Sequence, residues 1–439
     1  MDPIKLLAIL IFLGIYALLI TDKLHRTIVA LWGAFLFAGL PILTKEGVKL
    51  GLLTGGDLLH YENWEALGLI FGMFTLVAAL RESGFFRWLG LSIVKWADFD
   101  LLKIFLLFAV TSAVLSAFMD SITVLLFMAT LTVEVCGLFK VNPLPFLFLE
   151  ICSANIGGSA TMVGDPPNII IGTSYHFSFL DFVFNTGPIA LAVFLVNLGF
   201  FYLWYRKLFK DKDRLKQEAI EKHYHIEPAS AITDLRLLRI GVTIFAFVIL
   251  LLTVHHFIGV SVAFVGIMGA SLILLLGGDK MPEVLERIDW HTLIFFACLF
   301  IMVGGLEKVG VLSDIARWIA VVSGGNAFLA VTAILWLSAV LSAFIDNVPF
   351  AAAMVPIVKS LAATTGIPLT TLSWALALGT DIGGNGTPIG ASANVVGISI
   401  TEKRTGKKIS WAEYCKVAAP ATLVSVLVCS VLIYFRYLR

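Results

Sequence analysis

The chain contains one unit twice. The string SAVLSAFMD at residues 112–120 returns as SAVLSAFID at residues 338–346, with eight identities in nine positions at an offset of 226 residues. The same offset, without a gap, aligns NIGGSAT at 155–161 with DIGGNGT at 381–387. Because the matched residues include Asp, Asn, Thr and Gly, hydrophobic composition alone does not explain the match. The fold must therefore be one that two copies of a single unit can build.

Apolar runs of about 16 to 20 residues follow one another through both copies, as membrane spans do. Of all residues, 59% are hydrophobic and 14% are charged, whereas soluble chains carry roughly 25% charged residues. This composition excludes a soluble enzyme, a nucleic-acid-binding protein, a secreted disulfide scaffold and a disordered regulator. The five cysteines have no metal-ligand spacing, so we expect them to pack as small hydrophobes. We expect neither a cofactor nor a metal site.

We expect an all-α polytopic membrane protein built from two inverted repeats of five spans each, with a re-entrant helical hairpin and a broken helix per repeat. An odd number of spans per copy inverts the second copy relative to the first. The predicted domains are a first transmembrane repeat at 1–205, a cytoplasmic linker at 206–239 and a second transmembrane repeat at 240–439. The predicted spans, hairpins and interrupted spans are 4–20, 27–43, 64–81, 101–138, 145–172 and 187–205, then 240–254, 261–276, 290–306, 327–360, 371–398 and 417–435.

The basic residues predict an orientation. With the linker in the cytoplasm, 23 Lys and Arg lie inside and 8 lie outside, in agreement with the positive-inside rule. Ten spans with both termini outside satisfy this count and the inverted repeat together. No small-residue cleavage site precedes Thr21-Asp22-Lys23, so we interpret 4–20 as a retained span. We expect the protein in the cytoplasmic (inner) membrane, surrounded by lipid.

An aspartate stands in the middle of each hairpin segment, Asp120 in the first copy and Asp346 in the second. Ionisable groups at membrane depth cost roughly a few kcal/mol each, which makes them functional-site hypotheses. A helix that stops at small polar residues and restarts directs free backbone N–H groups at the tip. The alternative is that each aspartate only caps a helix end.

The interrupted spans carry a second motif, at 155–168 in the first copy and 381–394 in the second. Paired glycines and prolines break a helix there, and a break at membrane depth is tolerated where backbone lines a cavity or packs against protein. The glycines alone fit close helix packing equally well. The candidate substrate- or ion-binding residues of both motifs are Asp120, Ser121, Thr123, Asn155, Ser159, Thr161, Asp165, Asn168, Asp346, Asn347, Asp381, Asn385, Thr387 and Asn394. The proton-coupling candidates are Asp120, Asp346, Asp381 and Glu150, and we expect no catalytic residue.

The strings SAFMDS, SAFIDN, NIGGSATMVGDPPNIIIG and DIGGNGTPIGASANVV resemble the ion transporter superfamily, in particular its arsenite permease (ArsB) and melanosomal P protein branch. The sodium/proton antiporter NhaD and the divalent anion/sodium symporters are more distant relatives. The resemblance covers nearly the whole chain. It implies a homodimer, a scaffold part and a transport part in each protomer, and elevator-like alternating access. Some arsenite permeases also work with an ATPase subunit.

Charge at the site separates the substrates that this resemblance allows. No Lys or Arg lies in either motif to offset up to four carboxylates, so a di- or trianion would be repelled. The leading hypothesis is proton-coupled efflux of arsenite or antimonite. The alternative is a sodium/proton antiporter. The less favoured hypotheses are an anion (carboxylate) transporter, a channel and an intramembrane enzyme. No nucleic-acid partner is expected.

Overall fold

The computed structural model describes residues 3–21, 24–39, 41–44, 47–50, 52–210, 217 and 227–439. Residues 211–216 and 218–226 of the linker predicted at 206–239 lie outside these residues. The first copy forms α1 (Pro3–Thr21), α2 (Arg26–Gly39), α3 (Gly55–Tyr61), α4 (Trp64–Glu82), α5 (Phe85–Trp96), α6 (Leu101–Ser116), α7 (Ser121–Phe139), α8 (Leu144–Gly158), α9 (Pro166–Tyr175) and α10 (Phe179–Tyr205). The second copy forms α12 (Leu235–Ile258), α13 (Val262–Leu276), α14 (Met281–Glu286), α15 (Trp290–Lys308), α16 (Val311–Ser323), α17 (Ala327–Ser342), α18 (Asn347–Thr365), α19 (Leu369–Gly383), α20 (Ser392–Thr405) and α21 (Trp411–Ile433).

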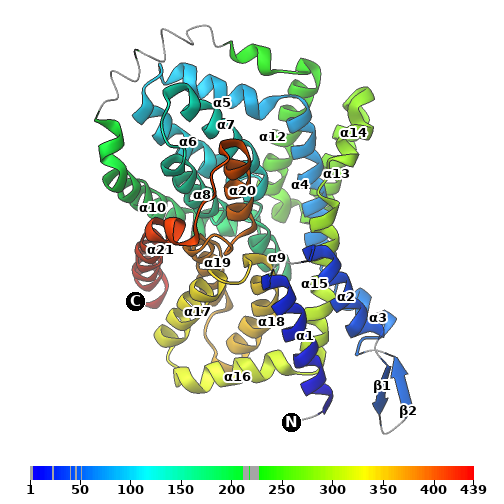
Figure 1. The fold of residues 1–439 in the computed structure, drawn as a ribbon. Coiled ribbons are helices and arrows are strands. Elements are labelled where there is room, and N and C mark those ends of the chain that lie inside the picture. The colour runs from blue at the N-terminus through cyan, green and yellow to red at the C-terminus, as the bar shows by residue number, and fades with distance from the viewer. Residues whose placement is uncertain are drawn as a thin grey trace.

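The helices recur at the offset of the sequence repeat. α4, α5, α6, α7 and α9 begin 226 residues before α15, α16, α17, α18 and α20. The equivalent helices α5 and α16 lie across opposite ends of the molecule (Figure 1). The second copy is therefore inverted relative to the first, and the all-helical inverted-repeat fold is confirmed. Among the described residues, seven helices are long and apolar enough to cross a membrane: α4, α7, α10, α12, α15, α18 and α21.

The one departure from an all-helical fold, within the described residues, is a small β-hairpin. β1 (Pro41–Thr44) pairs antiparallel with β2 (Gly47–Leu50). The sequence predicts a span from 27 to 43, but α2 ends at Gly39. Proline disfavours helix for the residue before it and lacks the N–H that a helix needs, so Pro41 explains the early end.

Each copy holds a hairpin and a broken helix, as expected. In the first copy α6 and α7 form the hairpin, with its tip at 117–120, and α8 and α9 form the broken helix. In the second copy α17 and α18 form the hairpin, with its tip at 343–346, and α19 and α20 form the broken helix. A short 3-10 turn, η4 (Gly384–Gly386), follows α19.

The two copies interleave. α4 packs along α13 of the other copy, and α2 packs along α15 in the same way. Likewise α7 packs along α20, and α9 packs against α18. The α4–α13 crossing is close, because a Cβ added at Gly72 would lie 2.2 Å from the Gly266 backbone. Each half therefore buries its helix faces against the other half.

Candidate functional site

Asp165 joins the two hairpin tips. Its carboxylate accepts a hydrogen bond from Ser121 Oγ at 2.6 Å, at the tip of the first hairpin, and from Asn347 Nδ2 at 2.7 Å, at the tip of the second. Asp165 is the N-cap residue of α9, but its side chain makes no capping hydrogen bond there. It is 2% exposed. A buried carboxylate needs such charge-assisted bonds to offset its desolvation.

Asp120 and Asp346 cap the helices that restart at the tips. Asp120 Oδ1 accepts the Thr123 backbone N–H at 2.9 Å, and Asp120 Oδ2 accepts Thr123 Oγ1 at 2.7 Å. Asp346 Oδ1 accepts the Val348 N–H at 3.1 Å. Both aspartates therefore cap a helix end, although Asp346 does more than cap. Capping leaves Asp346 Oδ2 free to contact groups outside its own helix.

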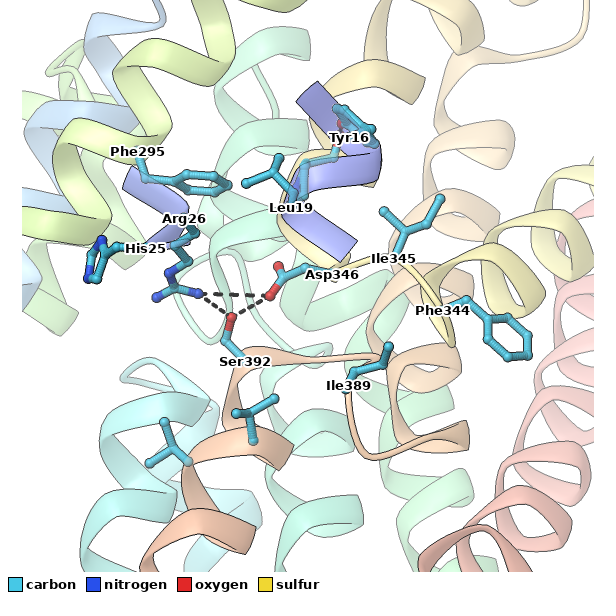
Figure 2. A pocket seen from close by; sticks show the side chains of 13 residues that line it. Tyr16, Leu19, His25, Arg26, Phe295, Phe344, Ile345, Asp346, Ile389 and Ser392 are labelled. Carbon is cyan, nitrogen blue, oxygen red and sulfur yellow. Dashed lines mark hydrogen bonds and ion pairs between the residues drawn. The ribbon is translucent and has the colours of Figure 1, made fainter. Parts of the chain in front are cut away.

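A cavity of about 280 Å³ opens beside Asp346 (Figure 2). It is lined by Tyr16, Leu19, His25, Arg26, Phe295, Phe344, Ile345, Asp346, Pro349, Ile389, Ser392, Val395 and Val396. Figure 2 shows the Arg26 guanidinium pointing toward Asp346 and Ser392, which come from the second hairpin and the start of α20. The cavity thus lies between α1, α15, the second hairpin tip and the second broken helix.

Arg26 corrects the charge argument made from the sequence. Its Nη1 lies 3.9 Å from Asp346 Oδ2 and also donates to Ser392 Oγ, which in turn donates to Asp346 Oδ2. Its Nη2 donates to Thr292 Oγ1 at 3.2 Å. Both motifs lack a cation, yet Arg26 reaches the site from the first turn of α2. The sequence signal was weak, because Arg26 follows His25 in a short connection where basic residues are common.

Asparagines join the two broken helices to each other. Asn155 Nδ2 on α8 donates to Asn385 Oδ1 at 2.8 Å and to Asn394 Oδ1 at 2.9 Å, both from the second copy. Asn168 and Asn394 each span their own break: Asn168 Nδ2 donates to the carbonyls of Gly158 and Thr161. Asn394 Nδ2 donates to the equivalent carbonyls in the second copy. These amides replace helix hydrogen bonds that the breaks remove.

In each copy, one threonine joins the broken helix to the hairpin by a hydrogen bond. Thr161 Oγ1 donates to the Ala117 carbonyl, and Thr387 Oγ1 donates to the equivalent Ala343 carbonyl. Both carbonyls lie just past the end of a hairpin helix, where helix geometry leaves acceptors without partners. The hairpin and the broken helix therefore lie close together, as predicted, and are hydrogen-bonded to each other in each copy.

Asp381 differs from the other three aspartates. It is fully buried, and neither of its carboxylate oxygens makes a hydrogen bond within the described residues. Asp165 and Asn168 are the side chains that act on it electrostatically. The sequence predicted Asp381 as a site residue, but the absence of any donor could not be read from the motif.

Two candidates do not join the tips and breaks in this way. Glu150 lies on α8 and accepts a hydrogen bond from Thr132 of α7, while its other oxygen has no partner. Ser159 donates to the Ile156 carbonyl of its own helix at 2.7 Å. Ser159 therefore shows a local role only. Tyr16, which is absent from the predicted set, lines the cavity, together with Ser392 of the second motif.

Comparison with known proteins places the chain in a family. A family model described as a citrate transporter (CitMHS) matches residues 16–379, most of the chain. The chain belongs to the citrate transporter family. A Mycobacterium tuberculosis protein described as an uncharacterized transporter is 35% identical to the present chain, and the match covers 99% of each protein.

The human P protein is also similar to the present chain. It is 30% identical over 95% of this chain, which spans 58% of the P protein. The predicted relation to the P protein is thus confirmed, whereas the relation to arsenite permeases and to NhaD stays a prediction. The crystal structure of the Alcanivorax borkumensis YdaH transporter, described as having an unusual topology, shares the fold. Its TM-score is 0.60 at 15% identity, covering 93% of this chain and 98% of that one.

Proposed function

We propose that this membrane transporter is a proton-coupled exporter of a small neutral solute, with arsenite or antimonite as the first substrate to test. The observation that carries the proposal is the charge of the site. Four carboxylates, those of Asp120, Asp165, Asp346 and Asp381, lie at the tips and breaks. Within the described residues, the cation recorded against them is Arg26, which faces Asp346 alone. Such a site favours protons and neutral or cationic solutes over polyanions.

Arsenous acid is a small neutral polyhydroxyl. Its O–H groups can donate to carboxylates, and its oxygens can accept from amide and hydroxyl donors. The cavity beside Asp346 offers these groups at about 280 Å³, a volume that suits a small solute. A carboxylate that binds either a proton or the solute would couple their movements, since both compete for the same oxygen lone pairs.

The proposal includes an elevator-like movement, in which hairpins and broken helices shift together against the remaining helices. The hydrogen bonds that Thr161 and Thr387 donate and that Asp165 accepts support it, because they hold both hairpin tips and both breaks as one group. We place the linker in the cytoplasm and both termini outside, in the cytoplasmic membrane, on the charge count.

Inside-out vesicles test the proposal. With an acid interior, vesicles holding the protein should accumulate labelled arsenite and release protons, and a protonophore should abolish the accumulation. Asp165→Asn should reduce the rate strongly, whereas the control variant Lys207→Gln, at an exposed lysine, should not. Arsenite flux that never exceeds equilibration would indicate a channel, and no arsenite flux would exclude this substrate.

Two other substrates follow from specific observations and use the same vesicles. Unpartnered buried oxygens on Asn155, Asn168 and Asp381 favour sodium, a hard cation that prefers oxygen ligands. Sodium-evoked loss of the pH gradient, without arsenite uptake, would assign sodium/proton antiport. Arg26 and the family description favour citrate. Labelled citrate uptake that Arg26→Met abolishes would assign a carboxylate substrate.

A further inference from the structure

A hydrogen bond between the two copies has a counterpart, related by the repeat, that lacks its proton donor. Asn155 Nδ2 donates to Asn394 Oδ1 at 2.9 Å. At the repeat offset of 226 residues, Asn155 corresponds to Asp381 and Asn394 corresponds to Asn168. Asp381 therefore stands toward Asn168 as Asn155 stands toward Asn394, and Asn168 is one of the side chains that act on the Asp381 carboxyl.

The orientation of the Asn168 amide is fixed by its other contacts. Both of its N–H hydrogens are used, by the carbonyls of Gly158 at 3.0 Å and Thr161 at 3.2 Å. A flipped amide would set its oxygen against two carbonyl oxygens, which repel it. The atom left to face Asp381 is thus Asn168 Oδ1, an acceptor that is buried and has no partner.

An ionised Asp381 would place acceptor against acceptor. Both of its oxygens are buried without a partner, and the charged group that acts on it is the carboxylate of Asp165, which is like-charged. Of the other charged groups on helices packed against α19, Glu150 accepts a hydrogen bond from Thr132. Asp181, Lys359, Glu413 and Lys416 have no recorded effect on Asp381. Within the described residues, no cation lies against Asp381, and neither of its oxygens has a hydrogen-bond donor to balance a negative charge.

We propose that Asp381 is a protonated carboxylic acid in this state and donates its O–H to Asn168 Oδ1. The neutral acid then makes the bond that the Asn155 amide makes at the equivalent position. One part of this proposal rests on the proposed function, namely that the Asp381 carboxyl carries the coupled proton. Loss of that proton leaves the two acceptors facing each other and weakens the contact between the first and second broken helices.

Infrared spectroscopy of the purified full chain in lipid tests the proton directly, without any substrate. With ¹³C-labelled aspartate, the wild type at neutral pH should show the C=O band of a protonated carboxylic acid, shifted by the label. Asp381→Asn should remove that band. Asn168→Leu should raise its frequency, because the hydrogen bond to the acid is lost, whereas the matched variant Asn394→Leu should leave the frequency unchanged.

The repeat supplies a control for folding and for assignment. Asp381→Asn copies the residue of the first repeat, so it should unfold at the wild-type temperature or above, whereas Asp381→Leu should unfold lower. The exchange Asn155→Asp with Asp381→Asn should restore a protonated-acid band from the other copy. In vesicles, Asp381→Asn should lower transport driven by a pH gradient by at least about tenfold and flatten its pH profile.

Each outcome decides the inference. A band that is missing in the wild type, or that survives in Asp381→Asn, overturns it, and a wild type that gains the band only when sodium is removed assigns a bound cation instead. The proposed function is judged apart from this: arsenite flux can fail while the band assigns the proton to Asp381. Conversely, proton-coupled arsenite flux without the band would retain the function and reject the residue.

Discussion

Asp165 is the residue on which both hairpin tips depend. Its two donors, Ser121 and Asn347, occupy equivalent positions in the two copies, but Asp165 itself has no acidic counterpart, because Ala391 stands there. The site is therefore asymmetric although the fold around it is symmetric. Because the acid is present in one copy only, a single carboxylate binds donors from both copies.

Removal of one Asp165 donor should destabilise the protein. Ser121→Ala and Asn347→Ala each leave the buried carboxylate short of a hydrogen bond, which costs about 1–3 kcal/mol. Thermal unfolding in detergent should report this loss. Ser159→Ala is the matched control, because Ser159 bonds only its own helix, and we expect less than about 1 kcal/mol. Equal losses in all three variants would contradict the assigned role of Asp165.

Arg26 and Asp346 should be coupled energetically. Arg26→Met leaves Asp346 in the cavity without its cation, and Asp346→Asn removes the charge that Arg26 faces. A double-mutant cycle on unfolding temperature should give a coupling of about 0.5–3 kcal/mol. Additive effects of the two substitutions would show that the 3.9 Å contact has no energetic weight.

Glu62, between α3 and α4 and outside the spans, predicts a pH effect on stability. Burial raises the pKa of Glu62 from 4.5 to about 7. Because the pKa is raised in the folded state, folding favours the protonated acid, so stability falls as pH rises through this window. Unfolding temperatures between pH 4.5 and 7 should fall less steeply in Glu62→Gln than in wild type. Parallel curves would refute the assignment.

Some of these residues were predictable and others were not. Ser121, Asp165 and Asn347 stand in repeated motifs whose breaks and small residues are visible in the sequence. Arg26 falls just before the span predicted at 27–43 and is the first residue of α2 in the structure, and no periodicity relates it to the motifs. Its place in the site depends on how α2 packs along α15, a tertiary contact that a sequence pattern does not encode.

Glycine sets the distance between hairpin and broken helix. A Cβ on Gly157 would lie 2.1 Å from the Ala113 carbonyl oxygen of α6, and one on Gly383 would lie 2.4 Å from the Ala339 carbonyl oxygen of α17. Of the two roles that the sequence left open for the paired glycines, close packing is thus realised in both copies. The helix ends were predicted less well than the breaks, as the early end of α2 shows.

Alanine at these glycines should force the helices apart. Gly157→Ala and Gly383→Ala should each cost about 1–3 kcal/mol through overpacking, measured as a lower unfolding temperature. Gly199→Ala in α10, where a Cβ meets no atom within 4 Å, is the control. We expect it to be neutral or slightly stabilising, because alanine favours helix. A loss at Gly199 equal to that at Gly157 would point to a general effect of alanine.

At the scale of the whole molecule, orientation is open to a labelling test. Lys210 follows η1 (Arg206–Phe209) and Ala363 lies near the end of α18, and both are exposed. A membrane-impermeant maleimide should label Lys210→Cys only in inside-out vesicles and Ala363→Cys only in right-side-out vesicles. The native cysteines, four buried and one partly buried, give the background. Reversed labelling would invert the proposed topology.

The interleaving of the two copies has a consequence for biosynthesis. The first half is synthesised before the second. Until the second half is made, α2, α4, α7 and α9 lack their packing partners α15, α13, α20 and α18. Asp165 waits without Asn347 as well. The first half can therefore make its own contacts, such as those of α8 with α6, α7 and α10, but the helix faces that pack on the second half stay uncovered until that half is inserted. Assembly is a late event of translation, and a chain truncated in its second half leaves the first half exposed to quality control.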